Sequence, residues 1–96
     1  MTPAPAKYEL KNPVVIEALQ FTDDVSARAI LDWIGNTESQ LRVDVVLDNE
    51  TVDHLLIFGA ANIQKVDKFW WVLLDRKGDF YVSSPSGFDE TFQPQQ

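Results

Sequence analysis

The 96-residue sequence has no cysteine, one histidine, one methionine and few basic side chains. Without cysteine the chain can form no disulfide bond, no thiolate metal site and no thiol nucleophile. Its longest apolar runs fall short of the roughly 18 residues that a membrane span needs. Eight basic against fifteen acidic side chains give a net charge of −7, which repels a phosphate backbone. We therefore predict neither a membrane partner nor a nucleic-acid partner.

Apolar residues make up 45% of the chain and include three tryptophans and six phenylalanines, enough for a packed interior. A chain of this length builds one core, so we expect a single domain. Three of the five prolines fall within residues 1–13, where helix formation is disfavoured. The sequence thus predicts an extended proline-rich arm over 1–13 and a single α+β domain over 14–96.

Hydrophobic periodicity predicts the elements of that domain. Residues 14–21 are typical of a strand, and apolar spacing at i, i+3, i+4 and i+7 predicts an amphipathic helix over 25–34, with Gly35 at its C′ position. Two hairpins follow, one joined by "DNET" at 48–51 and the other by "DRKG" at 75–78. We expect an antiparallel or mixed sheet of four to five strands with this helix packed on one face. The segment "FDETF" at 88–92 fits either a helical turn or a final extended segment.

The only histidine, His54, is predicted to share a strand face with Val52, Leu56 and Phe58. It follows the acidic residues Asp48, Glu50 and Asp53, whose oxygens could hold a divalent ion. The spacing lacks the glycine and the final glutamate of a calcium-binding loop, however. We interpret the segment as a solvated turn and predict no metal site, no cofactor and no catalytic residue.

Glu17 stands in the middle of the apolar strand "PVVIEALQFT", and an unpaired buried carboxylate is costly. Such a group needs backbone donors, a cation from a neighbouring segment, or a ligand. The candidate cations are Arg28, Arg42, Lys68 and Arg76. A structural pairing is the favoured interpretation, and contact with a ligand is the alternative.

Aromatic residues are the other candidate binding residues. Trp70 and Trp71 are adjacent in a predicted strand and must point to opposite faces, so one of them looks away from the helix, toward solvent, the arm or a partner. Trp33 lies near the edge of the helical apolar stripe, and Tyr81 lies in the last predicted strand. The candidate binding residues are Glu17, Trp33, Trp70, Trp71 and Tyr81.

The segments "KNPVVIEALQFT" and "GDFYVSSPSGFDETFQP" carry a resemblance to a widespread group of small bacteriophage-encoded proteins of unknown function. That group opens with a K-x-P-V-V-I-E-A-x-Q-[FW] segment and ends with a Gly-[Glu/Asp]-Phe-Tyr strand and a Pro-x-x-Phe-x-x-x-[Tyr/Phe] tail. The resemblance covers residues 11–94. This chain reads "KVDKFWW" where the group has Pro-Gly-Asp, so no role of that turn carries over.

The resemblance implies a phage context but brings no catalytic residues. We therefore expect a non-enzymatic accessory protein in the host cytoplasm, which binds a host or defence protein through its acidic surface and its aromatics. A virion component, such as a capsid decoration subunit, is one alternative, for which the proline-rich arm would reach a neighbour. A small-ligand binder for a nucleotide-like molecule is another. Self-association is left open.

Overall fold

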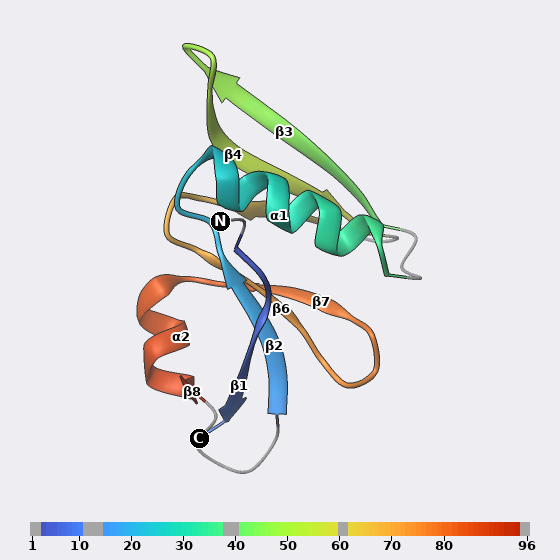
Figure 1. Ribbon diagram of the computed structural model, residues 1–96, viewed down its shortest axis with the longest axis vertical. Helices are drawn as coiled ribbons and strands as arrows, with labels where there is room; N and C mark the ends of the chain where they lie inside the picture. The colour runs from blue at the N-terminus through green and yellow to red at the C-terminus, as the bar shows by residue number, and fades with distance from the viewer. Residues whose placement is uncertain (1–2, 11–14, 38–40, 60–61, 95–96) are drawn as a thin grey trace.

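The computed structural model describes residues 3–10, 15–37, 41–59 and 62–94 (Figure 1). Ten elements follow one another along this part of the chain. They are β1 (Ala6–Leu10), β2 (Val15–Gln20), α1 (Asp24–Gly35), β3 (Arg42–Asp48), β4 (Thr51–Phe58), β5 (Ile63–Val66), β6 (Trp71–Leu74), β7 (Phe80–Ser83), α2 (Pro85–Thr91) and β8 (Phe92–Pro94).

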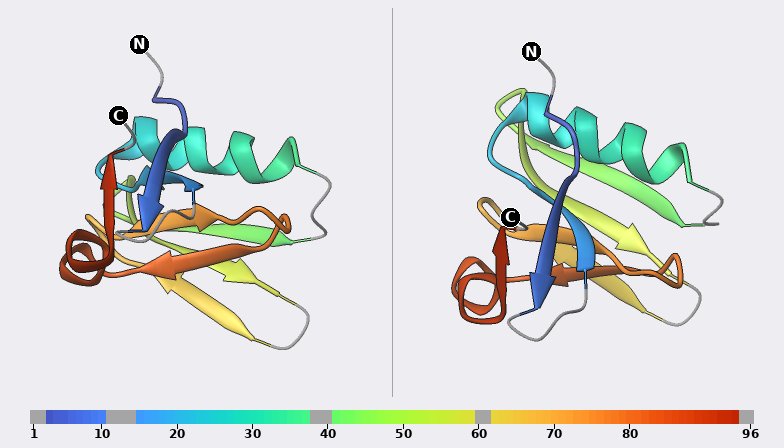
Figure 2. Two further views of the ribbon diagram at one scale, coloured as in Figure 1. Left: turned by 90° about the horizontal axis from the view of Figure 1, so that it is seen from below. Right: turned by 60° about the horizontal axis from the view of Figure 1, so that its bottom comes forward.

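The predicted α+β class is confirmed, but the strands divide between two sheets. The larger sheet has five strands in the order β7-β6-β2-β1-β8, and the smaller has three in the order β3-β4-β5. Every pairing between neighbouring strands is antiparallel. Figure 2 shows α1 lying across one side of the molecule, with strands of both sheets beneath it.

Part of the N-terminal arm belongs to the larger sheet. Strand β1 lies between β2 and β8, with Lys7 opposite Glu17 and Tyr8 opposite Ile16. Because β8 comes from the other end of the sequence, the arm's own composition does not indicate this pairing. The extended backbone that its prolines favour is compatible with it.

Both predicted hairpins are confirmed. Strands β3 and β4 are joined by Asn49 and Glu50, whose φ angles of 51° and 69° are both positive, as in a type I′ turn. Strands β6 and β7 are joined by residues 75–79, where Gly78 has a φ of 88°. Glycine reaches this conformation without a Cβ clash, which explains its place in the turn.

His54 lies on the opposite strand face from Val52, so the predicted face is wrong. The β3–β4 register pairs Val46 with His54 but Leu47 with Val52, which leaves Asp53 as an extra residue in β4. Such a bulge reverses the alternation of side chains beyond it. Regular alternation along β4 predicts that the residues after the bulge that share the buried face with Val52 are exposed. The bulge brings them to the buried face instead.

Helix α1 begins with a reciprocal cap and ends one residue later than predicted. Asp23 accepts a hydrogen bond from the Ser26 backbone N–H at 2.9 Å, and the Ser26 hydroxyl accepts one from the Asp23 backbone N–H at 2.9 Å. Gly35 is the last helical residue and Asn36 is the C-cap in right-handed conformation, so Gly35 is not the C′ residue that its position suggested. Trp33 is half-buried at the helix margin.

The main core lies between α1 and the facing sides of the two sheets. It is formed by buried residues of α1, β2, β4, β5, β6 and β7. The most completely enclosed large side chains are Phe21, Ile30, Ile34, Leu55, Ile57, Val66 and Val72. These side chains are apolar, and the equally enclosed Ser26 belongs to the capping box of α1. Burial of hydrocarbon surface from both sheets onto one helix therefore accounts for most of the assembly.

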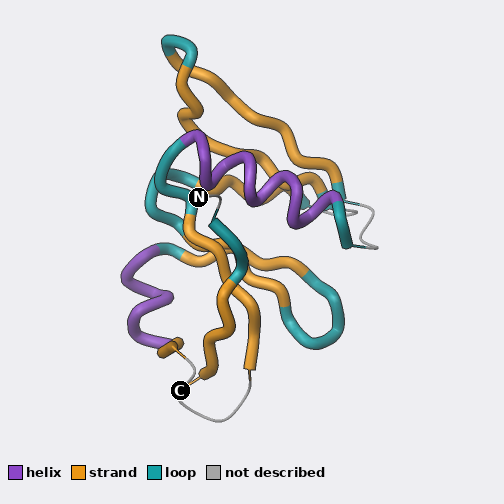
Figure 3. Tube along the Cα trace, viewed as in Figure 1, coloured by secondary structure: helices purple, strands orange, loops and turns teal. Residues whose placement is uncertain are grey.

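A second, smaller cluster covers the outer face of the five-stranded sheet. Its buried members are Ile16, Ala18, Leu73 and Phe88, with Tyr8, Trp71 and Phe92 packed against them. Helix α2, capped by the Ser84 hydroxyl, supplies Phe88, and strand β8 follows it directly (Figure 3). The segment 88–92, which the sequence left open, therefore contains both a helical turn and the start of an extended strand.

Candidate functional site

The β6–β7 turn fixes a carboxylate next to a tyrosine hydroxyl. Asp75 Oδ1 accepts hydrogen bonds from the backbone N–H groups of Lys77 and Asp79, each at 2.9 Å. The Tyr81 hydroxyl lies near enough to the Asp75 carboxylate for the two groups to interact electrostatically. The turn therefore holds Asp75 in place through main-chain bonds and sets its carboxylate beside the Tyr81 hydroxyl.

Both groups have shifted pKa values. The backbone hydrogen bond from Asp79 lowers the pKa of Asp75, and the bonds from Lys77 and Tyr81 act in the same direction. The negative charge of Asp75 raises the pKa of Tyr81. At neutral pH the pair is thus an ionised carboxylate and a protonated phenol, and the phenol oxygen keeps lone pairs that can accept a further hydrogen bond.

Beside this pair the outer face of the five-stranded sheet forms a hollow of about 340 Å³, here called the outer-face hollow. Ile16, Asp75, Leu73, Tyr81, Val82, Ser83 and Phe92 line it. Leu73 and Tyr81 are directly paired across β6 and β7, so their side chains project from the same face. Its floor is formed by the buried Ile16 and Leu73.

The outer-face hollow combines apolar side chains with an ionised carboxylate. Its apolar floor favours a hydrocarbon or aromatic group, and Asp75, Tyr81 and Ser83 supply its polar side chains. Tyr81 is 50% exposed, which is high for a large aromatic side chain beside an apolar depression. A ligand with an apolar body and a hydrogen-bond donor or positive charge at one end would match this arrangement.

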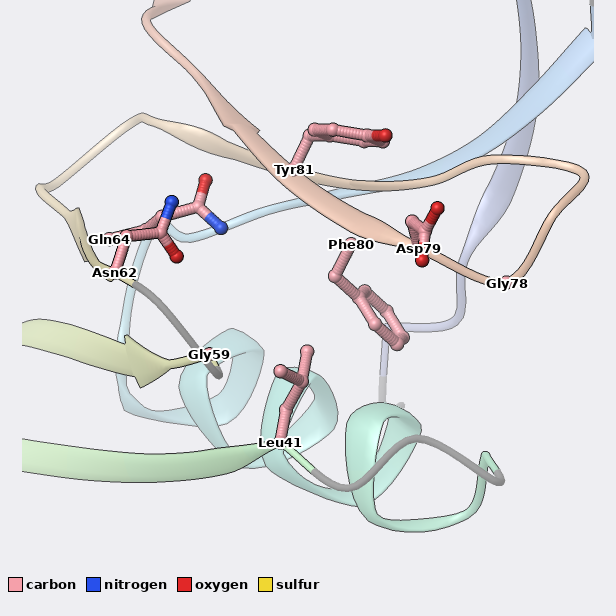
Figure 4. Close-up of a pocket in the computed structure, with 8 residues that line it drawn as sticks. All are labelled: Leu41, Gly59, Asn62, Gln64, Gly78, Asp79, Phe80 and Tyr81. Carbon is pink, nitrogen blue, oxygen red and sulfur yellow. The ribbon is translucent and has the colours of Figure 1, made fainter.

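A second hollow of about 400 Å³ opens on the other side of β7, between the ends of the two sheets. Leu41, Gly59, Asn62, Gln64, Gly78, Asp79, Phe80 and Tyr81 line it. Figure 4 shows Phe80 pointing toward Leu41 while the Tyr81 ring projects away on the opposite side of the strand. Apart from Asp79, this hollow presents amides and backbone rather than a fixed charged group, so it offers less for specific recognition.

The structure separates the predicted tryptophans from one another. Trp70 packs against the main core, and Trp33 meets Phe80 edge to face with ring centroids 5.2 Å apart. Trp71 faces the other way and packs in the smaller cluster, 5.3 Å from the Tyr8 ring of the arm. The structure confirms that Trp70 and Trp71 point to opposite faces, and Trp71 packs against Phe88 of α2 as well as Tyr8 of the arm.

Tyr81 is the predicted site residue that lines the outer-face hollow. Trp71 lines a different, smaller depression of about 250 Å³ beside the arm. The five predicted residues therefore do not converge on one surface. The candidates were chosen by residue type, whereas their grouping in space depends on which strands pair.

Glu17 is half-buried in β2, between Lys7 of β1 and Leu74 of β6. The candidate cations Arg28 and Arg42 form ion pairs with Asp32 and Asp44 instead, each at 3.5 Å. Among the ion pairs of the described residues, none includes Glu17. The cation directly across the strand pair is Lys7, which sequence reasoning had placed in the arm.

Asp75 is the site residue that sequence reasoning missed. The sequence analysis treated Asp75 only as a turn residue, because Asp-Arg-Lys-Gly is typical of a hairpin connection. The available signal was the pair Asp75 and Tyr81, which flank that turn at hairpin spacing. Phe92 and Ile16 reach the same hollow only through long-range pairing of β8, β1 and β2.

His54 has a single close polar partner in its own strand. Its Nδ1 lies 2.7 Å from Asp53 Oδ2, next to it in the chain at the bulge. Across the described ranges, no three acidic or imidazole side chains gather in an arrangement that could hold a metal ion. Nor does any helix of those ranges have the length and apolar character to cross a membrane.

Comparison of the chain with protein families, with curated proteins and with solved structures finds no match. The geometry of the outer-face hollow is therefore the basis for a functional proposal, together with the phage-protein resemblance of the opening segment.

Proposed function

We propose that the protein is a non-enzymatic phage accessory protein that binds a host or defence polypeptide at the outer-face hollow. The observation that carries the proposal is the half-exposed Tyr81, which lines an apolar hollow together with the ionised Asp75. One apolar side chain of the partner fills the hollow. A basic side chain next to it in the partner meets Asp75.

The apolar part of this recognition rests on shape and burial. A hollow of about 340 Å³ exceeds the volume of one large side chain and lies at the small end of ligand sites. Tyrosine is enriched among residues that dominate interfaces, because it brings large area at little entropic cost. Tyr81 and the floor residues Ile16 and Leu73 together form such an anchor point.

The choice of a basic partner rests on charge. The net charge of −7 draws positively charged partners toward the whole molecule, and Asp75 supplies a fixed negative group at the hollow itself. Arg76 and Lys77 lie in the same turn and counter this attraction for a partner that approaches over the turn. The partner's basic group is therefore expected on the Tyr81 side of Asp75.

The proposed phage context rests on the resemblance of "KNPVVIEALQFT" and the C-terminal segment to small bacteriophage-encoded proteins. A proline-rich arm that reaches a neighbour would suit the virion alternative, but residues 6–10 of that arm are an inner strand of the protein's own sheet. A small nucleotide-like ligand remains the second candidate, since the volume of the outer-face hollow would accept a small molecule.

Affinity capture from a bacterial lysate tests the proposal, with wild type, Tyr81→Ala and Ile63→Ala as baits. Ile63 is 61% exposed on the other sheet, so Ile63→Ala is a matched loss of exposed apolar surface. We expect a polypeptide retained by wild type and Ile63→Ala, with affinity reduced about thirtyfold by Tyr81→Ala. Equal retention by all three baits, or by none, contradicts the proposal.

Circular dichroism of Tyr81→Ala shows whether loss of retention reflects loss of the fold. Thermal-shift measurements with nucleotides and small aromatic amines separate the second candidate from the first. A shift of the wild-type midpoint by such a molecule, abolished in Tyr81→Ala, supports a small ligand instead of a polypeptide.

A further inference from the structure

Strand β3 is an edge of the three-stranded sheet, with β4 on one side of it. It is seven residues long, and Figure 1 shows it at the outer margin of the molecule. In the described part of the chain no strand pairs with its other side. An edge of this length presents main-chain donors and acceptors to any strand that can align with it.

Side chains of β3 alternate between two faces. Val43 and Val45 pack against the main core, and Leu47 projects from the same face but is 60% exposed. Arg42, Asp44, Val46 and Asp48 project from the opposite face. The strand therefore carries a basic residue at one end, an acidic residue at the other, and an uncovered leucine.

We propose that two copies of this chain pair antiparallel through their β3 strands, about a two-fold axis at Val45. This register sets Arg42 opposite Asp48 of the second copy and Val43 opposite Leu47 of the second copy. The opposite charges attract, and the exposed Leu47 gains an apolar neighbour. Each of these contacts occurs twice, as an isologous interface requires.

Charge selects this register over its neighbours. A two-fold axis perpendicular to the sheet requires that residues of the same face lie opposite one another. The axis therefore passes through a residue of β3, and the neighbouring registers have their axis one residue earlier or later along the strand. An axis at Asp44 sets two Asp44 carboxylates opposite each other, and an axis at Val46 sets Asp44 opposite Asp48. Like charges directly across a strand pair are destabilising, so the axis at Val45 is favoured over both of its neighbours.

The pairing produces a continuous six-stranded sheet from two three-stranded ones. Strand β3 belongs to the three-stranded sheet, whereas the outer-face hollow is lined by residues of the five-stranded sheet and its β6–β7 turn, so the pairing uses a different sheet from the hollow. The dimer itself does not depend on what the hollow binds.

Oxidative cross-linking tests the register, because the chain contains no cysteine. In Val45→Cys the two introduced thiols lie directly opposite each other across the axis, at a separation suited to a disulfide. We expect a covalent dimer from Val45→Cys under mild oxidation. Val25→Cys, a matched valine replacement 51% exposed on α1, should stay monomeric. Equal cross-linking of both variants, or of neither, overturns the proposal.

Charge reversal gives a second, independent measurement by sedimentation equilibrium. Arg42→Glu and Asp48→Lys each create a repulsive pair with the second copy, and each should weaken dimerisation roughly tenfold. The double variant restores opposite charges and should recover the wild-type dimer. Arg76→Glu, the same charge change in an exposed turn, is the control. The inference is contradicted if the wild type is monomeric at every concentration. It is also contradicted if the two single variants dimerise as strongly as the wild type.

Discussion

The indole of Trp71 stacks on the phenyl ring of Phe88, with ring centroids 3.9 Å apart and planes 5° from parallel. Trp71 belongs to β6 and Phe88 to α2, so this contact joins the C-terminal helix to the middle of the five-stranded sheet. Tyr8 of β1 meets both rings edge on, at 5.3 and 4.9 Å. Three segments that are distant in sequence thus cover the outer face together, next to the outer-face hollow.

Phe88→Ala is expected to destabilise the protein by about 3–5 kcal/mol, because it removes a buried aromatic ring and leaves a cavity under α2. Phe88 is 2% exposed. Urea denaturation followed by tryptophan fluorescence measures the loss. Ile63→Ala, at a side chain 61% exposed, should cost less than about 1 kcal/mol. Equal losses for the two variants would show that the smaller cluster contributes little.

Glu50→Gly is expected to stabilise the protein by about 1 kcal/mol, because it relieves an unfavourable backbone conformation. Glu50 has a φ of 69°, which costs a residue with a Cβ but not glycine, and asparagine followed by glycine is the preferred pair in a type I′ turn. Thermal denaturation measures the gain. Lys77→Gly is the control in the other turn, where φ is not positive, and should give no gain. A lower midpoint for Glu50→Gly would mean that the turn has a different geometry.

Ser26→Ala is expected to cost about 1–3 kcal/mol, because it removes the acceptor of two backbone N–H groups at the start of α1. The Ser26 hydroxyl is bonded to the N–H of Thr22 at 2.7 Å and of Asp23 at 2.9 Å. Chemical denaturation checks this value, with the exposed Ser86→Ala as the matched control. No difference between the two serine variants would contradict the capping role.

Asp75 should make the stability of the protein depend on acid pH. Its pKa in the folded protein is lower than the 3.8 of the unfolded chain, chiefly through the Asp79 backbone hydrogen bond. Its contribution is therefore present above pH 3.8 and is lost as the pH falls through the folded-state pKa. Asp75→Asn should lower the free energy of unfolding at pH 7, and the difference from wild type should shrink at strongly acidic pH. A difference in stability that does not change with pH would contradict the stabilising role of the ionised Asp75 carboxylate. Asp89→Asn on α2 is the control.

Local signals in the sequence were sufficient for the helix and both hairpins. Capping residues before Val25, the helical apolar stripe, and glycine in "DRKG" each act within a few residues, and the corresponding elements are present. The bulge at Asp53 was not predictable, because the sequence there alternates as in a regular strand. Its consequence is the reversed face of His54.

The candidate site depended on long-range pairing. Tyr81 was named from its aromatic character alone, and the sequence did not indicate that Ile16, Leu73 and Phe92 would lie beside it. That grouping requires β1 to lie between β2 and β8, a choice set by the whole sheet rather than by any segment. The division of the strands into two sheets was missed for the same reason.

The central claim, that the outer-face hollow receives a polypeptide, is tested most directly by photo-cross-linking from its rim. A photoreactive phenylalanine analogue replaces Tyr81 in one sample and the exposed Ile63 in the other, and each is irradiated in bacterial lysate. The account predicts a covalent adduct with a polypeptide from position 81 and none from position 63, with the cross-linked peptide containing an apolar residue next to a basic one. Equal labelling from both positions, or no polypeptide adduct from position 81, would contradict it.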